Sequence, residues 1–413
     1  MLDLPSLADH LDDCVHCGLC LADCPTYLLW GQEADSPRGR ITQVQDALLD
    51  GAGISPAMVG HMDACVGCLA CVSACPAGVA YDRILAEART AIEHTHRRSA
   101  AERALRLTLF ETLPFPERLR NLVPALAAMR RLSGPGRRQG RLAQLAAAVP
   151  DPPSREEREL PIPAFTPARG ERRGQVGLLL GCVQRVFFPA VHRATIGLLT
   201  AEGYDVHAPR LPDCCGALEL SAGEREHALA RAQATLAAFA ELGELDAVIA
   251  NAAGCGTALK DYGALVGSAA AWDFAGRVRD IQEFLAAIAP RAPRGPLPLR
   301  VVLHDACQLS HGQGVVTAPR ALLRAIPELE LLEVPHEAQI CCGAAGLYPV
   351  LAPEPAAQLG RRKAQAVLAA GGDVLAAASP GCLTQLGRHL RELGAEMEIR
   401  HPVELLWRSV QAA

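Results

Sequence analysis

Two cysteine quartets with the same spacing lie near the start of the chain and constrain it more than any other feature. The first is Cys14, Cys17, Cys20 and Cys24-Pro25, and the second is Cys65, Cys68, Cys71 and Cys75-Pro76. This spacing is the known ligand pattern of two-cluster bacterial ferredoxins, in which the fourth cysteine of one run completes the other cluster. We therefore expect one [4Fe–4S] cluster on Cys14, Cys17, Cys20 and Cys75, and a second on Cys65, Cys68, Cys71 and Cys24.

Zinc is the alternative occupant of such quartets, because four cysteines commonly bind it. Zinc sites usually present paired Cys-x2-Cys groups, whereas this chain carries two complete triplets, each followed by Cys-Pro. We therefore prefer the clusters. The stretch between the quartets is longer than in a small ferredoxin and is helix-like at 41–49, so we expect an α-helical ferredoxin domain over residues 1–96.

Three polar side chains near the quartets have two interpretations each. His16 lies inside the first triplet, where we prefer a solvent-facing loop residue to a hydrogen-bond donor to the cluster. Arg38 and Arg40 lie between the quartets. They either raise the reduction potential of a negatively charged cluster or lie in a turn as solvated charges.

The 16 cysteines are not accompanied by the features of a secreted disulfide protein. The segment from Met1 to Pro5 has neither the charges nor the apolar run of a leader, and no apolar run reaches the roughly 18–20 residues that span a bilayer. We expect a cytoplasmic protein, with peripheral binding to the inner face of the cytoplasmic membrane as a further option. Grouped cysteines in that reducing compartment favour metal ligation. The net charge of −5 gives no reason to expect a nucleic-acid partner.

The second half of the chain repeats itself, with one copy in 176–295 and the other in 296–413. Each copy contains an apolar run, a cysteine, a Cys-Cys-Gly triplet, another apolar run and a Gly-Cys pair. The cysteines are Cys182, Cys214, Cys215 and Cys255 in the first copy and Cys307, Cys341, Cys342 and Cys382 in the second. This self-similarity predicts a duplicated domain. Short apolar strands between Ala/Leu-rich helical stretches predict parallel-sheet α/β units, with the cysteines near strand ends.

The Cys-Cys-Gly (CCG) repeats allow three kinds of site: a further iron–sulfur cluster, a structural zinc ion or a redox-active dithiol. We favour the cluster. Gly216 and Gly343 permit the φ angles that such a turn needs. His304, His311 and His336 lie near the second repeat as candidate ligands or proton carriers.

Residues 97–175 are expected to connect the two halves. The pattern over 97–133 is helical but interrupted by Pro114, Pro116 and Pro124, and 134–175 is a linker rich in Pro, Gly and Arg. Arginines interspersed with apolar residues from Arg97 to Leu132 allow a membrane-surface helix. We prefer a helical connector that packs on the chain's own domains or on a partner.

The order of these modules resembles the iron–sulfur subunits of glycolate oxidase (glycolate dehydrogenase) over essentially the whole chain. Shared motifs include Cys14-Val15-His16-Cys17-Gly18, Pro37-Arg38-Gly39-Arg40-Ile41 and Cys341-Cys342-Gly343-Ala344-Ala345-Gly346. The resemblance implies an α/β multidomain fold with a helical ferredoxin domain and two tandem CCG domains. It also implies an electron-transfer role, in which FAD-containing partner subunits oxidise glycolate to glyoxylate and this subunit passes the electrons towards a membrane quinone or another acceptor.

In this interpretation the isolated chain carries no catalytic residues and no flavin, since no GxGxxG fingerprint follows a predicted strand. Alternatives are the same role in a glycerol-3-phosphate or lactate dehydrogenase, a catalytic subunit resembling heterodisulfide reductase, and a redox sensor or scaffold. In heterodisulfide reductase subunits each CCG motif ends in CxxC. Here Cys255 and Cys382 are not followed by that final cysteine, so the fifth thiolate is missing.

Overall fold

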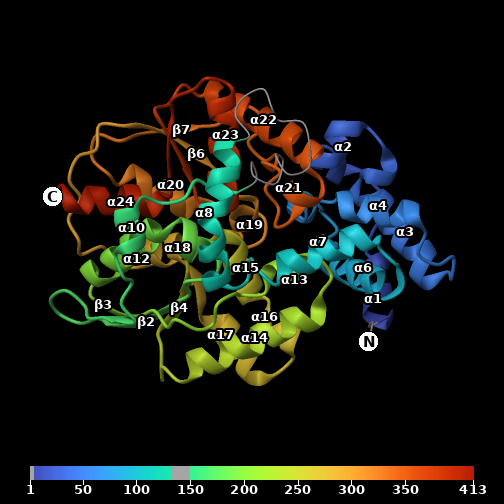
Figure 1. Cartoon of the computed structure of the whole chain (residues 1–413), viewed down its shortest axis with the longest axis horizontal. Helices are drawn as coiled ribbons and strands as arrows, with labels where there is room; N and C mark the ends of the chain where they lie inside the picture. Colours follow the sequence, from blue (N-terminus) through green and yellow to red (C-terminus); the bar gives the residue numbers. More distant parts are fainter. Residues whose placement is uncertain (1–3, 133–148) are drawn as a thin grey trace.

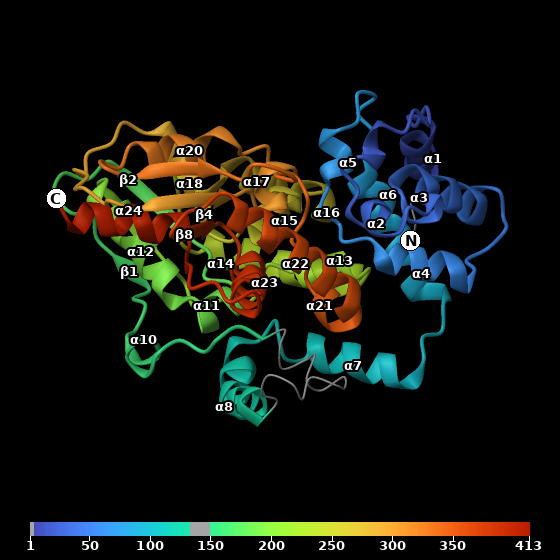
Figure 2. The same ribbon diagram turned by 90° about the horizontal axis from the view of Figure 1, so that it is seen from above.

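The structure is a computed structural model of the chain, and it describes residues 4–132 and 149–413 (Figure 1). Helices alone make up the N-terminal part at one end of the molecule, and two α/β units make up the rest (Figures 1 and 2). The predicted fold class is confirmed: a helical ferredoxin-type region is followed by two α/β repeats.

No strand occurs between residues 4 and 96. The helices there are α1 (Leu4–Asp12), α2 (Pro25–Trp30), α3 (Pro37–Val44), α4 (Pro56–Ala64), α5 (Ala70–Ser73) and α6 (Tyr81–Thr95), and the π-helical turn Gln45–Leu49 continues α3. Proline takes the first position of α2, α3 and α4, where it costs no intrahelical hydrogen bond. The side chains of Ser36 and Ser55 cap α3 and α4 by accepting hydrogen bonds from backbone N–H groups.

Two helices, α7 (Ala100–Phe110) and α8 (Pro116–Leu132), link the N-terminal region to the repeats and run along one side of the molecule (Figure 2). Pro114 and Pro116 separate these helices as expected, but Pro124 lies inside α8 and does not end it. Leu119 and Val123 of α8 pack against Val186 and Phe187. The helical segment therefore packs on the chain's own first repeat.

Part of the expected linker belongs to the first sheet. Residues 133–148 lie outside the described structure, and α10 (Arg155–Glu159) follows them. Strand β1 (Phe165–Thr166) pairs antiparallel with β3 (Tyr204–His207), and β2 (Gly174–Leu178) begins before residue 176. The first sheet therefore includes residues from the segment expected to be a linker.

Apart from the edge strand β1, the two sheets have the same strand order, in which β3, β2, β4 and β5 correspond to β7, β6, β8 and β9. The first is β1-β3-β2-β4-β5 and the second is β7-β6-β8-β9. The remaining strands are β4 (Ala247–Ala250), β5 (Val278–Asp280), β6 (Arg300–His304), β7 (Glu330–Glu333), β8 (Val374–Ala377) and β9 (Glu398–Arg400). All strand pairs except β1–β3 are parallel. The register of the central pair is also the same in both sheets, since Val176 of β2 pairs with Ala247 of β4 and Val301 of β6 pairs with Val374 of β8. This common register confirms the duplication.

Helices surround both sheets. In the first repeat they are α11 (Val183–Phe187), α12 (Pro189–Ala201), α13 (Ala217–Ser221), α14 (Arg225–Ala240), α15 (Ala253–Lys260), α16 (Tyr262–Val266), α17 (Ala269–Arg277) and α18 (Ile281–Ala287). In the second they are α19 (Cys307–Ser310), α20 (Thr317–Arg324), α21 (Tyr348–Leu351), α22 (Pro353–Ala369), α23 (Pro380–Glu392) and α24 (Pro402–Gln411).

The repeats share one hydrophobic core. Buried Leu178 of the first sheet, Leu303 of the second and Leu405 of α24 belong to the same cluster. Helix α24, at the C-terminus, packs on α12 of the first repeat (Figure 1). Neither repeat is therefore an independent packing unit. Among the described residues, no helix has both the length and the apolar character that crossing a bilayer requires.

Candidate metal centres

The first predicted cluster site is a small cavity near the surface of the ferredoxin-type region. Cys14, Cys17, Cys20 and Cys75 all line a space of about 30 Å³. The Cys17 side chain is exposed, whereas the other three are partly buried. Burial and the charges of neighbouring thiolates raise the pKa of Cys20. The structure thus brings the four predicted ligands of the first cluster to one cavity, and Cys71 lies at the same cavity.

The second predicted site is buried. Cys24, Cys65, Cys68 and Cys71 are inaccessible to solvent or nearly so. Burial and the charges of Cys65, Cys24 and Cys20 raise the pKa of Cys71 well above its ordinary value. Crowded thiols that repel one another as thiolates need a cation or a metal to hold them deprotonated. This all-thiol donor set fits an iron–sulfur cluster.

A buried arginine supplies positive charge at the second site. Arg40 is only 1% exposed, and its Nε donates to the His61 carbonyl oxygen at 2.7 Å. Its Nη2 donates to Thr26 Oγ1 at 3.1 Å and lies 3.4 Å from Asp35 Oδ1. Burial raises the pKa of Cys65, but the charges of Arg40 and Arg89 outweigh it, so the net shift is downward. Of the two interpretations for this residue, the structure supports the charge beside the cluster.

Arg38 and His16 lie on the surface. Arg38 forms an ion pair with Glu33 and donates from Nη1 to the His16 carbonyl oxygen at 3.1 Å. His16 is an exposed loop residue, as preferred from the sequence. Arg38 therefore supports the loop that carries the first triplet, with its charge at the surface.

Each CCG repeat brings its four cysteines together in the same pairing. In the second repeat, the Sγ atoms of Cys307 and Cys341 are 3.8 Å apart, and Cys342 Sγ donates to Cys382 Sγ at 3.4 Å. In the first repeat, Cys182 interacts with Cys214 and Cys215 with Cys255, and these interactions raise the pKa of Cys182 and of Cys215 well above the ordinary value. The predicted ligand sets of both repeats are thus spatial clusters.

The first cysteine of each CCG triplet is favoured as a thiolate. In the second repeat Cys382 is favoured as well, since a hydrogen bond from Cys342 lowers its pKa to about 5. Hydrogen bonds from Cys182 and Cys215 lower the pKa of Cys214 well below its ordinary value. Hydrogen bonds from Cys307 and Cys342 do the same for the pKa of Cys341. The sulfurs of Cys214 and Cys341 also accept the backbone N–H of the following glycine at 3.4 Å.

Those glycines have the predicted left-handed conformation, with φ of +79° at both Gly216 and Gly343. A Cβ at Gly343 would lie 2.7 Å from the Ala356 carbonyl oxygen, and one at Gly216 would lie 3.1 Å from the Ala228 carbonyl oxygen. Both glycines are therefore required by backbone angle and by space.

The three candidate histidines differ in position. His304 is buried at the end of β6, and its ring lies with Cys342 and Cys382, the three sets of ligand atoms being within 4.8 Å of one another. His311 Nδ1 lies 2.9 Å from Ser73 Oγ of the ferredoxin-type region. His336 is exposed. Only His304 lies among the cysteines of the second repeat.

Sequence reasoning missed a carboxyl group in the first repeat. Glu219 is 1% exposed, accepts from Arg231 Nε at 3.2 Å and lies 4.0 Å from Cys214 Sγ. Burial, followed by the charge of Cys214, raises the pKa of this carboxyl group to about 7. The residue lies in the short helix α13, where a glutamate carries no signal that separates it from a surface side chain.

The second ferredoxin quartet contacts the second repeat directly. Cys68 and Cys341 belong to one buried cluster, together with Ile340 and Tyr348. Burial and the charge of Cys341 raise the pKa of Cys68 well above its ordinary value. Gln308 Nε2, next to Cys307, donates to the Gly67 carbonyl oxygen at 2.7 Å. The second quartet therefore lies against the second repeat, with Cys68 and Cys341 in the same buried cluster.

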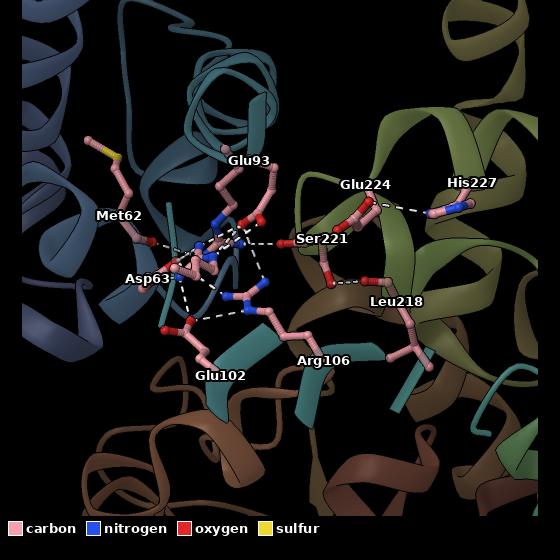
Figure 3. A network of polar contacts seen from close by, with 11 residues as sticks. Met62, Asp63, Glu93, Glu102, Arg106, Leu218, Ser221, Glu224 and His227 are labelled. Carbon is pink, nitrogen blue, oxygen red and sulfur yellow. Dashed lines mark hydrogen bonds and ion pairs between the residues drawn. The ribbon is translucent and has the colours of Figure 1, made fainter. Parts of the chain in front are cut away.

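The ferredoxin-type region contacts the first repeat through polar groups. Arg89 Nη1 donates to the Ser221 carbonyl oxygen at 2.7 Å, and its Nη2 donates to the carbonyl oxygens of Met62 and Cys65 at 2.9 and 2.6 Å. Figure 3 shows Met62 and Ser221 on opposite sides of this network. One guanidinium therefore joins the loop of the second quartet to the first repeat.

Two arginines of the connecting segment bind carboxylates in the same region, and Figure 3 shows one of them, Arg106, beside Glu102. Arg98 is 7% exposed and forms ion pairs with Asp63, Glu93 and Glu102. Arg106 is equally buried and pairs with the same carboxylates. Charges satisfied internally do not face a membrane, so these two arginines support the connector interpretation.

A cavity of about 1320 Å³ lies where the ferredoxin-type region and both repeats meet. All eight CCG cysteines and Cys65 line it. The carboxyl ends of the central strands of both sheets open towards this space, which is where parallel sheets bind ligands. The cavity is large enough for a small-molecule substrate or acceptor.

Comparisons with known proteins agree with this organisation. Residues 10–79 match the 4Fe-4S dicluster domain, and residues 176–260 and 301–387 each match the cysteine-rich (CCG) domain. The chain is 33% identical to the probable glycolate oxidase iron-sulfur subunit of Bacillus subtilis, over 96% of this chain and 93% of that protein. It is 31% identical to the glycolate oxidase iron-sulfur subunit of Escherichia coli, over 96% and 94%. A partial relative is a fumarate reductase (CoM/CoB) subunit of Methanothermobacter marburgensis, 30% identical over 59% of this chain and 48% of that protein.

Proposed function

The chain belongs to the family of glycolate oxidase iron–sulfur subunits, and from this premise we propose that it carries electrons from the flavin subunit of a glycolate dehydrogenase complex to an acceptor. The observation that carries the proposal is that thiol groups occur from exposed Cys17, through the buried second quartet, to the cavity that all eight CCG cysteines line. When bound, two [4Fe–4S] clusters supply sites that accept and release one electron at a time.

The first quartet is the proposed entry point. Cys17 is exposed, and its neighbours Val15 and Leu19 are 70% and 58% exposed. Exposed apolar side chains beside a redox site suit the docking of a partner subunit. The proposed partner is the FAD-containing subunit, on which glycolate would be oxidised to glyoxylate, so that this chain alone is not catalytic.

The second quartet is the proposed intermediate step. Cys71 lies at the cavity of the first quartet and among the thiols of the second, so the two proposed clusters are adjacent. Cys68 in turn contacts Cys341 of the second repeat. The buried Arg40 guanidinium stabilises negative charge at this position and therefore favours electron acceptance.

The CCG repeats are the proposed exit. We infer that their eight cysteines hold further metal, preferably in iron–sulfur clusters and otherwise as zinc, and that the cavity that they line admits a quinone or another small acceptor. Peripheral binding to the membrane would bring a quinone within reach.

The proposal is tested by preparing the full chain anaerobically with its flavin-containing partner subunits and adding glycolate, lactate or glycerol 3-phosphate. We expect glycolate to bleach the iron–sulfur absorbance faster than the other two substrates. Iron and acid-labile sulfide should reach at least about eight per chain. Bleaching only by lactate or glycerol 3-phosphate would reassign the complex, and stoichiometric zinc with little iron would contradict the electron-transfer role.

One observation favours a second candidate function, in which the repeats reduce a disulfide or a quinone themselves. The cavity exposes the thiols of both repeats to one common space, which a simple electron carrier does not require. Turnover of such an acceptor by the dithionite-reduced chain without its partner would support this function. Turnover that depends on the partner would oppose it.

A further inference from the structure

We propose that His304 is a nitrogen ligand of the metal centre in the second repeat, so that this centre combines imidazole with thiolates while the first repeat offers thiolates alone. The inference rests on the proposed function, because it takes the second repeat to hold a thiophilic metal. That metal is the iron of a cluster or a zinc ion, since both accept thiolate and imidazole ligands.

The geometry fits shared ligation. His304 is 2% exposed, and its ring nitrogens lie within 4.8 Å of the Sγ atoms of Cys342 and Cys382. Those two sulfurs are 3.4 Å apart. Ligands of one tetrahedral metal, bound at about 2.0–2.3 Å, lie roughly 3–4 Å from one another. A single metal atom therefore reaches all three residues after small side-chain movements.

Apart from its electrostatic effect on the thiols of Cys341 and Cys382, the imidazole has no role in the described part of the structure. Neither ring nitrogen of His304 has a hydrogen-bond partner among the described residues. Burying an unpaired polar group costs free energy, and native proteins usually avoid it. A bound metal would use the lone pair of one nitrogen and remove part of that cost.

The first repeat shows that packing alone does not demand a histidine here. Because Val176 faces Ala247 as Val301 faces Val374, the residue equivalent to His304 is Leu179. Leu179 is 4% exposed and packs beside Cys215 in a buried cluster. In the first repeat, where the candidate ligands are thiols only, an apolar side chain therefore fills the position that His304 takes in the second.

Neutral imidazole in place of a thiolate removes negative charge from a metal centre. In iron–sulfur proteins this substitution raises the reduction potential. The second repeat, which contacts Cys68 of the ferredoxin-type region, would accept an electron more readily than an all-thiolate site.

The test uses the full chain, purified anaerobically with natural-abundance or ¹⁵N-labelled histidine. Iron, sulfide and zinc are counted, and the reduced protein is examined by pulsed EPR. If the metal is iron, we expect a coupling from a bound nitrogen that changes with the label. If it is zinc, X-ray absorption at the zinc edge should show one nitrogen among sulfur neighbours.

His304→Leu copies the residue of the first repeat and should lose the nitrogen signal and the metal of the second repeat, while keeping the iron of the ferredoxin-type region. His336→Leu, at an exposed position before Cys341, is the matched control and should change neither. His304→Cys should restore the metal without the nitrogen signal and with a lower reduction potential.

Two outcomes would overturn this inference and leave the proposed function untouched. The first is metal in the second repeat without nitrogen coupling, and the second is full metal content with an unchanged spectrum in His304→Leu. A wild-type chain with about eight irons and no zinc would overturn it together with the proposed occupancy of the repeats. Bleaching by glycolate in that same preparation would leave the electron-transfer function standing.

Discussion

The two CCG repeats place the same four thiols on equivalent strands, yet the surroundings of those thiols differ. Leu179 and Glu219 stand in the first repeat at the positions of His304 and Gly346 in the second. The first repeat meets the ferredoxin-type region through arginines, among them Arg83 and Arg89. The second repeat meets it through polar contacts such as that of Gln308 with Gly67, and it also shares a buried cluster that contains Cys68 and Cys341. Duplication thus preserved the thiol framework, and the neighbouring side chains allow the two sites to serve different roles.

The largest expected difference concerns electron transfer. Cys341→Ala should slow glycolate-dependent reduction of the acceptor on the order of 100-fold, and Cys214→Ala on the order of 10-fold. The reason is that Cys341 lies in one buried cluster with Cys68 of the second quartet, whereas the first repeat meets the loop of that quartet through Arg89. Steady-state turnover of the reconstituted complex measures both. Each variant must keep the EPR signal of the ferredoxin-type region, which controls for misfolding. An equal or larger loss in Cys214→Ala would place the first repeat on the main electron path.

Backbone space gives the next difference. Gly343→Ala should lower the free energy of unfolding by about 2–4 kcal/mol, because a Cβ there meets a backbone oxygen at 2.7 Å in addition to the cost of positive φ. Gly216→Ala, with its closest contact at 3.1 Å, should cost about 1–2 kcal/mol.

Urea denaturation under anaerobic conditions measures both values. Gly394→Ala is the control for positive φ alone, since φ there is +78° and no heavy atom lies within 4 Å of its Cβ position. If Gly343→Ala loses no more unfolding free energy than this control, the backbone near Ala356 moves aside and the short contact does not destabilise the protein.

The smallest expected effect belongs to a polar cluster of the first repeat. Asn251 stands where the second repeat has Ala378, and its Nδ2 lies 3.0 Å from Nδ1 of buried His192. Burial lowers the pKa of His192 to about 3, so the folded protein keeps this ring neutral while the unfolded chain protonates it below about 6.5. Its contribution to stability is complete above that pH and is lost as the pH falls towards 3.

Lowering the pH from 7.5 to 5.5 should therefore remove about 1.4 kcal/mol of unfolding free energy through this group. His192→Gln should show that much less pH dependence than the wild type in parallel urea titrations. Equal slopes would mean that folding does not lower the pKa of His192.

Local features of this fold could be predicted from the sequence. Cysteine spacing led to both quartets, and the apolar runs before Cys182 and Cys307 led to central strands of both sheets, because these signals lie within a few residues of one another. The two-residue strand β1 escaped prediction, since its pairing with β3 depends on a segment far along the chain.

Long-range contacts could not be predicted for the same reason. The contact of Cys68 with Cys341 joins residues from two domains, and nothing near either cysteine encodes the other. The burial of Arg40 likewise depends on Asp35, Thr26 and His61 closing around it. Two arginines two positions apart, Arg38 and Arg40, look alike in the sequence and differ completely in burial.

Helix α24 has a consequence for how the protein is made. It is formed by the last residues of the second repeat but packs on α12 of the first, within the shared core. Domains of many proteins fold in order during synthesis, the N-terminal one first. Here the first repeat lacks part of its core until α24 has been made. We therefore expect a chain that lacks α24 to leave the core shared by both repeats incomplete.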